Sequence, residues 1–375
     1  MVDEMQRTPM KFIKPTRSHI GKPIELTKGY VMQKWIHEQK LVQVMLDNCS
    51  IQNMEHMYMY TDSCGREATE SDVYLFGLGP LYELLKTSMI VLSATGLDEM
   101  PGSKVNMALQ GYLRFCDQFW PGHQDDKDAS YKNLNRISDE QRVDFNSLPD
   151  EARAAYGLPY ISYLLYQKLY RCDSGLTPEK KFEAYLYGMI HYLDVLSAFE
   201  IEVMKYLFWD TNRKVLHPLP QTVQDRYKRI KDNFGKAGTK TVERCRYIAF
   251  DRAMDSMWLK MANTAEDNDA GIDINGLDIK VEMWLGTSDQ KLFEISKDIY
   301  SSPTSYSNMG RLSVVREEEL SMLPYWKFVD NLSKDILLSR HGVKSGEVSY
   351  KEHLRRIDSA IIDIEKSLYG HFELS

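Results

Sequence analysis

The sequence contains little cysteine, no long apolar run and no repeated unit. Each of these absences excludes some classes of protein. The five cysteines, at positions 49, 64, 116, 172 and 245, never form a CxxC pair. This argues against a disulfide framework and against a cysteine zinc site. The nine histidines are equally scattered and form no HExxH motif. We therefore expect reduced thiols and little basis for transition-metal chemistry on nitrogen or sulfur.

Apolar segments are short as well. The richest, residues 184–199, is interrupted by His191 and Asp194, and no window reaches the roughly 18 uninterrupted apolar residues of a membrane span. The first twenty residues mix acids, bases and prolines without the apolar centre of a secretory signal. These features predict a soluble, cytoplasmic protein with no membrane partner.

The sequence does contain enough apolar material for a large core, together with a surplus of acids. Its 375 residues are 43% hydrophobic, which suits one large domain or two ordinary ones. The formal net charge of -7 counts against a nucleic-acid partner, because phosphate affinity comes mostly from lysine and arginine. Local clustering can override that total, and acids gathered to hold cations would themselves lower the net charge.

Periodicity divides the chain into four regions. Helical spacing of apolar residues predicts a helix over roughly 28–48, and the Met/Tyr alternation before Asp62 predicts a short buried strand. Aromatic-rich amphipathic runs predict helices over 73–234, and the apolar run 281–285 predicts a second strand.

Two acids follow the two predicted strands. Asp62 and Asp289 each end an apolar run, and an acid in that position projects into the crevice where α/β folds bind their ligands. If the two strands are adjacent and parallel, both carboxylates converge at one edge of the sheet. Oxygen ligands at that edge would suit Mg²⁺ or Mn²⁺.

The predicted helices offer further acids. Glu200 and Glu202 interrupt an apolar stretch and are two residues apart, so at most one of them faces the same way as the apolar stripe. Asp251 and Asp255 are four apart and share one helical face. Two carboxylates on a mostly buried face repel each other unless a positive group lies between them, and a divalent cation is one such group.

The order of these four motifs resembles that of the PIN-domain ribonucleases, which include the toxin ribonucleases of toxin-antitoxin pairs. Asp62-Ser63-Cys64 resembles the family's first strand end, and the segment from Thr287 to Leu292 resembles its last. The family's glutamate corresponds to Glu202 or Glu200, and its third acid to Asp251, with Asp255 as an addition. The resemblance implies an α/β/α core with a parallel sheet, here elaborated by a large helical insertion, and a metal-dependent endonuclease site made of acids. It divides the chain into an N-terminal arm, helix and first core strand over 1–72, the helical insertion over 73–194, a PIN-like core over 195–310 and a helical C-terminal region over 311–375.

These observations predict a metal-dependent endoribonuclease, a hydrolase that could act as a toxin or as a phage-defence effector. The expected catalytic acids are Asp62, Glu202, Asp251 and Asp289. The expected ligands of Mg²⁺ or Mn²⁺ are Asp62, Asp251, Asp255 and Asp289. The expected RNA contacts are Lys228, Arg229, Lys231, Lys236, Lys240 and Arg244.

Each of these residues also has a purely structural interpretation. Asp289 fits the N-cap of the helix that follows it, Asp251 a salt bridge with Arg246 or Arg252, and Asp62 an Asx-turn. The basic run fits a solvated helix face. A different function therefore stays open, that of a non-catalytic helical interaction or scaffold subunit of a bacterial or phage assembly. A single-stranded DNA substrate, an inhibitory or assembly protein partner and a homo-oligomer also stay open.

Overall fold

A computed structural model describes most of the chain and divides it into two compact units. The described residues are 6–14, 24–87, 89–100, 102–120, 144–211, 219–236, 239–267, 271–274, 276–301, 312–340 and 348–374. Unit 1 comprises Met1–Val143 and Trp258–Ser313, and unit 2 comprises Asp144–Met257 and Val314–Ser375. The predicted helical insertion, 73–194, therefore contributes to both units.

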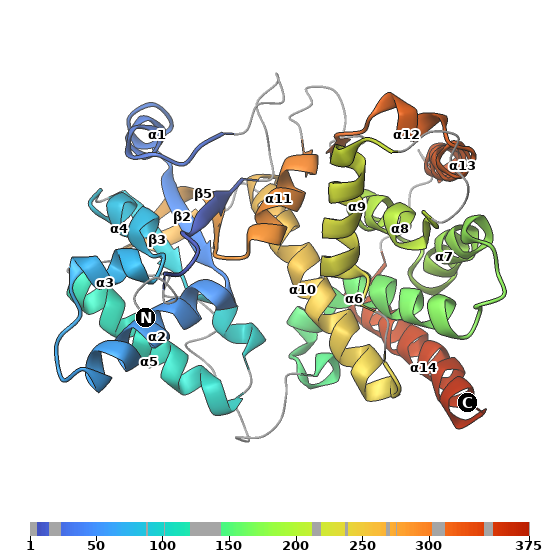
Figure 1. The fold of residues 1–375 in the computed structure, drawn as a ribbon, viewed down its shortest axis with the longest axis horizontal. Coiled ribbons are helices and arrows are strands. Elements are labelled where there is room, and N and C mark those ends of the chain that lie inside the picture. Colours follow the sequence, from blue (N-terminus) through green and yellow to red (C-terminus); the bar gives the residue numbers. More distant parts are fainter. Residues whose placement is uncertain are drawn as a thin grey trace. The chain divides into compact units, whose positions relative to one another are not determined.

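Unit 1 is built on a small, mostly parallel sheet. The strands are β1 (Lys11–Ile13), β2 (Leu41–Leu46), β3 (Ile90–Ser93), β4 (Gly271–Ile274) and β5 (Leu277–Thr287). Their order is β1-β5-β2-β3, with β2 parallel to both β3 and β5, while β1 and β4 pair antiparallel with β5 (Figure 1). Leu46 lies beside Gly286, so the next residues, Asp47 and Thr287, face each other where both strands end.

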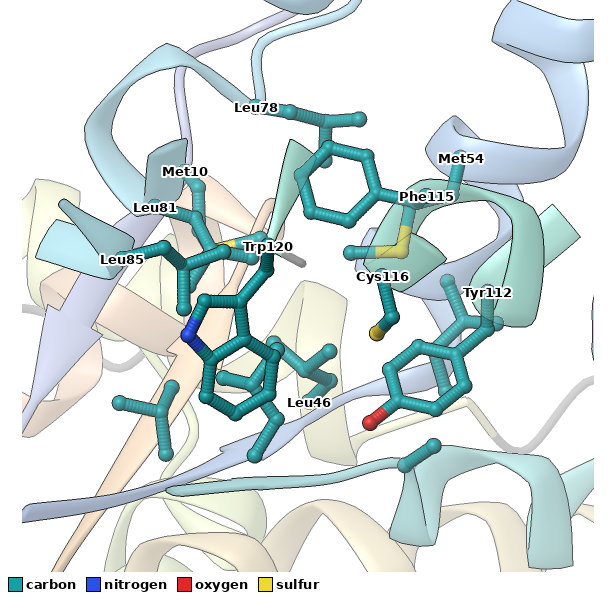
Figure 2. Close-up of a cluster of buried hydrophobic side chains, with 14 of the residues drawn as sticks. Met10, Leu46, Met54, Leu78, Leu81, Leu85, Tyr112, Phe115, Cys116 and Trp120 are labelled. Atoms are coloured by element: carbon teal, nitrogen blue, oxygen red, sulfur yellow. The ribbon is translucent and has the colours of Figure 1, made fainter. Parts of the chain in front are cut away.

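Helices cover this sheet. They are α1 (Lys28–Gln33), η1 (Lys34–Glu38), α2 (Asn48–Ser63), α3 (Glu70–Leu75), α4 (Gly79–Leu85), η2 (Thr95–Glu99), α5 (Gly102–Phe119) and α11 (Gln290–Asp298). A further strand pair, β6 (Ile299–Ser301) and β7 (Leu312–Val314), follows α11. Figure 2 shows Tyr112 and Phe115 of α5 and the following Trp120 gathered beside Leu46 of β2 in the buried core. All six residues of β2 are buried, as expected of a parallel strand covered on both faces.

The predicted strand before Asp62 is wrong, because residues 48–63 form helix α2. The Met/Tyr run looks alternating, but its buried residues are Met54, Met57, Tyr58 and Thr61, which is the spacing of one helical face. The predicted helix over 28–48 is also wrong beyond residue 38, because β2 occupies 41–46. A strand, β3, likewise interrupts the helices predicted over 73–234.

Unit 2 is helical in the residues that the structure describes. Its elements are η4 (Phe145–Ser147), α6 (Asp150–Arg171), α7 (Pro178–Leu193), α8 (Ala198–Phe208), α9 (Gln221–Phe234), the first part of α10 (Val242–Asp267), α12 (Glu318–Met322), α13 (Pro324–Arg340) and α14 (Tyr350–Leu374). Helices α6 and α14 approach closely at Gly157, where an added Cβ would lie 2.3 Å from Ile357 Cδ1. The aromatic-rich runs supply the core of this unit, with Tyr160, Tyr163 and Phe182 almost fully buried.

The chain is therefore a mixed α/β protein with a small, mostly parallel sheet, as predicted. The finer expectation, a PIN-like core, stays a prediction. Among the described helices, none is long and apolar enough to cross a membrane.

Candidate functional site

The site is built first on Asp47, which follows β2 and begins helix α2. Its Oδ1 accepts a hydrogen bond of 2.8 Å from the amide of Ser50, the geometry of an N-cap. Its Oδ2 accepts a short hydrogen bond from the hydroxyl of Thr287, the last residue of β5. The side chain is buried, with 5% of its surface exposed, so the carboxylate lies inside the edge where β2 and β5 end.

Asp289 completes the same edge from β5. Its Oδ1 accepts hydrogen bonds from the amides of Lys291 at 2.7 Å and Leu292 at 3.1 Å, and its own amide donates to the Thr287 hydroxyl at 2.9 Å. Thr287 thus bridges Asp47 and Asp289. The predicted strand and acid are both found, and the N-cap interpretation is found with them. Within the described residues Asp289 Oδ2 makes no hydrogen bond, so this oxygen is available to a ligand.

Other polar groups belong to the segments that follow β2, β3 and β5. Asn53 donates from Nδ2 to Ser288 Oγ at 3.1 Å, which ties α2 to the residue before Asp289. Strand β3 ends beside β2, and Thr95 in the η2 turn after it has a buried hydroxyl oxygen with no partner among the described residues. The adjoining Gly96 lies against the chain at Asp47, because an added Cβ would be 2.3 Å from the amide nitrogen of Asn48.

Burial shapes the electrostatics of this edge. It raises the pKa of Asp47 to about 6, and the negative charge of Asp289 acts in the same direction, against the hydrogen bonds from Ser50 and Thr287. Among the described residues neither Asp47 nor Asp289 forms an ion pair. A desolvated carboxylate at a strand end is typical of functional sites, and a bound cation would stabilise its charged form.

Asp62 lies away from this edge. It is in the last turn of α2, exposed, and paired with the Arg114 guanidinium at 2.7 and 2.9 Å. This arginine lowers the pKa of Asp62. Fifteen residues of helix separate Asp62 from Asp47, a rise of about 22 Å. The structure therefore does not bring Asp62 and Asp289 together, because the strand expected before Asp62 is a helix that runs away from the edge.

The remaining predicted acids all belong to unit 2, where cationic side chains neutralise them. Glu202 forms ion pairs with Arg316 and, at 3.1 Å, with Lys205. Arg252 lies between the other two, 3.3 Å from an Asp251 oxygen and 2.8 Å from an Asp255 oxygen. The positive group expected between these two aspartates is therefore supplied by arginine, as the salt-bridge interpretation of Asp251 proposed.

The neighbouring acid, Glu200, is fully buried on α8 and accepts a short hydrogen bond from Ser256. Asp255 also accepts a hydrogen bond of 3.2 Å from Asn233. Across the part of the chain that is described, no three side chains of His, Cys, Asp or Glu come together to hold one metal ion. A shared cation with four protein carboxylates is thus not the arrangement found among these residues.

Some of the predicted RNA contacts are exposed, and others are partly buried. Lys231 is partly buried and donates from Nζ to the carbonyl of Leu207 at 2.7 Å, and burial lowers its pKa. Arg229 is half-buried. The exposed members of the set are Lys228, Lys236, Lys240 and Arg244.

Sequence reasoning missed Asp47. The signal was present as the mostly apolar run 41–46, which contains two valines and is followed by Asp47 with Ser50 three residues on. This is a strand end joined to a helix N-cap. Its apolar spacing also fits the end of a helix over 28–48, and a short apolar run cannot separate the two.

No protein-family model matches the chain, and neither curated proteins nor solved structures contain a match to it. The side chains at the edge of the sheet where β2 and β5 end are therefore the basis for a functional proposal.

Proposed function

We propose that the carboxyl edge of the sheet in unit 1 binds a hard divalent cation, Mg²⁺ or Mn²⁺, between Asp47 and Asp289. One observation carries this proposal: Asp47 and Asp289 follow adjacent parallel strands, and the Thr287 hydroxyl links them by donating to the Asp47 carboxylate and accepting from the Asp289 backbone amide. Mg²⁺ commonly binds through one or two carboxylates and keeps water or substrate phosphate in its other positions. Two acids and several hydroxyls fit that donor set better than they fit a zinc site.

The reaction we propose is hydrolysis of an RNA phosphodiester bond, the endoribonuclease activity predicted from the sequence. Asp47 and Asp289 would hold the ion. The Thr287 hydroxyl would orient the Asp47 carboxylate, and the amides of Lys291 and Leu292 would orient that of Asp289. Such an ion activates water and stabilises charge on a phosphoryl oxygen. Helices α2 and α11 both begin at this edge, and the positive ends of their dipoles favour an anionic group there. Exposed Lys228, Lys236, Lys240 and Arg244 of unit 2 would contact the RNA backbone.

A second function is favoured by a specific observation. Asp62, Glu202, Asp251 and Asp255 are all engaged in ion pairs, so four of the five acids expected to serve catalysis or metal binding have structural partners. This favours the non-catalytic helical interaction or scaffold subunit. The cytoplasmic location and the toxin or phage-defence role are further expectations of the ribonuclease proposal.

Binding and cleavage assays separate the two functions. Mn²⁺ binding is measured by calorimetry on the wild type and on Asp47→Asn, Asp289→Asn and, as a matched control, Asp62→Asn. We expect at least about a tenfold loss of affinity for the first two variants and none for the control, since one lost ligand interaction of about 1.4 kcal/mol gives a factor of ten. Equal affinities in all four proteins contradict the cation site.

Cleavage of labelled RNA and single-stranded DNA is then followed with Mg²⁺ or Mn²⁺. RNA cleavage that Asp289→Asn abolishes supports the ribonuclease. A cation that binds without cleavage of either polymer excludes nuclease activity and leaves the interaction subunit.

A further inference from the structure

The outer face of α14 carries one continuous stripe of polar and exposed residues. Its opposite face is buried and includes Ile357, which packs against Gly157 of α6. Figure 1 shows α14 as the long helix that ends at the C-terminus. The stripe repeats at three- and four-residue steps, so its members lie along one side of the helix. It consists of Glu352, Arg355, Arg356, Ser359, Ile362, Asp363 and Lys366.

The charges of this α14 stripe are complementary to those of a second copy of the stripe that runs antiparallel to it. Ser359 is its centre, and Arg355 and Asp363 lie four residues before and after it. Glu352 and Lys366 lie seven residues before and after it. Each pair joins opposite charges, so a second copy of the helix placed antiparallel over Ser359 meets an opposite charge at all four positions. That self-complementarity is what a two-fold, isologous interface requires.

We propose that two copies of this chain form a dimer by packing their α14 stripes antiparallel about a two-fold axis at Ser359. Arg355 of each copy faces Asp363 of the other, and Glu352 of each copy faces Lys366 of the other. The small, exposed Ser359 at the axis suits a close approach, because the distance between packed helices depends on the side chains at their contact. The proposal does not depend on the cation site or on catalysis.

The charges needed for these contacts are available in the single chain. Asp363 and Lys366 form no side-chain hydrogen bond or ion pair with any described residue. Arg355 and Arg356 share one carboxylate, Glu352, with contacts of 2.7 to 3.0 Å. Two guanidinium groups on one carboxylate leave a surplus positive charge before Ser359, and Asp363 of a second copy lies opposite it.

An apolar contact accompanies the charges. Ile362 is 66% exposed and adds one apolar side chain to this otherwise polar stripe. In the antiparallel arrangement Ile362 lies opposite Arg356 of the other copy, because both are three residues from Ser359. At Arg356, α14 and the end of α7 border an open hollow of about 430 Å³, which Glu352, Arg355, Ser359 and Asp363 of the stripe also line. Ile362 of the second copy contacts the Arg356 side chain at this hollow.

Charge reversal tests the proposal in the full-length protein. The dimer dissociation constant is measured by analytical ultracentrifugation for the wild type, Asp363→Arg, Arg355→Asp and the double variant. Each single change sets like charges opposite each other twice per dimer, and the double change restores opposite charges with the sides exchanged. We expect each single variant to weaken the dimer at least about tenfold and the double variant to recover it within about threefold, given the size of exposed ion-pair energies.

A cross-link provides a second measurement. Ser359→Cys brings two thiols together at the axis, so mild oxidation gives a covalent dimer faster than in the wild type or in Lys351→Cys, an exposed position on the same helix. The wild-type background matters, since Cys49 and Cys64 are exposed. A wild-type chain that is monomeric at every concentration overturns the proposal, and so does a dimer that Asp363→Arg leaves intact. A dimer without faster cross-linking at Ser359 also overturns it, and then a different partner covers the stripe.

Discussion

The acids of unit 1 and the acids of unit 2 are held in different ways. Asp47 and Asp289 are satisfied by backbone amides and a hydroxyl at the sheet edge. Glu202, by contrast, is buried and forms ion pairs with Arg316 and Lys205. Amides and hydroxyls leave the negative charge in place for a cation to meet, whereas arginine and lysine cancel it. An acid among apolar residues is therefore weak evidence of a site until its partners are known.

The largest expected effect tests the structural role of unit 2. Glu202→Gln removes the charge that balances Arg316 and Lys205, both of which are mostly buried. Breaking a buried ion pair leaves an uncompensated charge, so we expect a loss of about 3 kcal/mol in the free energy of unfolding. Urea denaturation measures this loss. If this variant instead bound Mn²⁺ more weakly and kept its stability, Glu202 would belong to a metal site. The acids of the two units would then no longer differ in how they are held.

A pH series sharpens the description of unit 1. The folded state raises the pKa of Asp47 to about 6 from 3.8, so between these values the folded protein binds more protons than the unfolded one. Stability should then fall as pH rises from about 4 to 6, by up to about 3 kcal/mol in total. Asp47→Asn keeps an N-cap and should flatten this dependence.

Mg²⁺ should have the same flattening effect at the upper end of that range, since a bound cation stabilises the charged carboxylate. Denaturation of the wild type and of Asp47→Asn across this pH range, with and without Mg²⁺, gives the comparison. A slope that persists in Asp47→Asn would show that other groups cause it.

A backbone contact gives the next effect. Gly96→Ala adds a Cβ that would lie 2.3 Å from the amide nitrogen of Asn48 and 2.4 Å from the carbonyl carbon of Asp47. Because both atoms belong to the backbone, the turn after β3 must move, and we expect a loss of about 2 kcal/mol together with weaker Mn²⁺ binding. Gly175→Ala, whose added Cβ meets nothing within 4 Å, is the matched control. Equal behaviour of the two variants would contradict the close packing at this edge.

The fold and the site could be predicted from the sequence only where the signal is local. The strand before Asp289 and the N-cap after it lie within one short stretch, and both were predicted. The segment that carries β2 gives apolar spacings that suit a helix as well as a buried strand, so Asp47 was missed. Its contact with Thr287 joins residues 240 positions apart, and only the pairing of β2 with β5 creates it. The ion pair of Glu202 with Arg316 also joins residues far apart in the sequence, so no sequence motif predicts it.

The smallest expected effect concerns Asp62, the acid whose predicted role depended on a strand that the structure replaces with a helix. Asp62→Asn removes an exposed ion pair with Arg114, and such pairs contribute little because water and salt already screen them. We expect a melting temperature close to that of the wild type, no loss of Mn²⁺ affinity and, where the protein cleaves RNA, an unchanged rate. Calorimetry and the cleavage assay measured beside Asp289→Asn decide this. If Asp62→Asn lost activity as Asp289→Asn does, the helix that separates Asp62 from Asp47 could not run as it does, and the assignment of the site to Asp47 would fail with it.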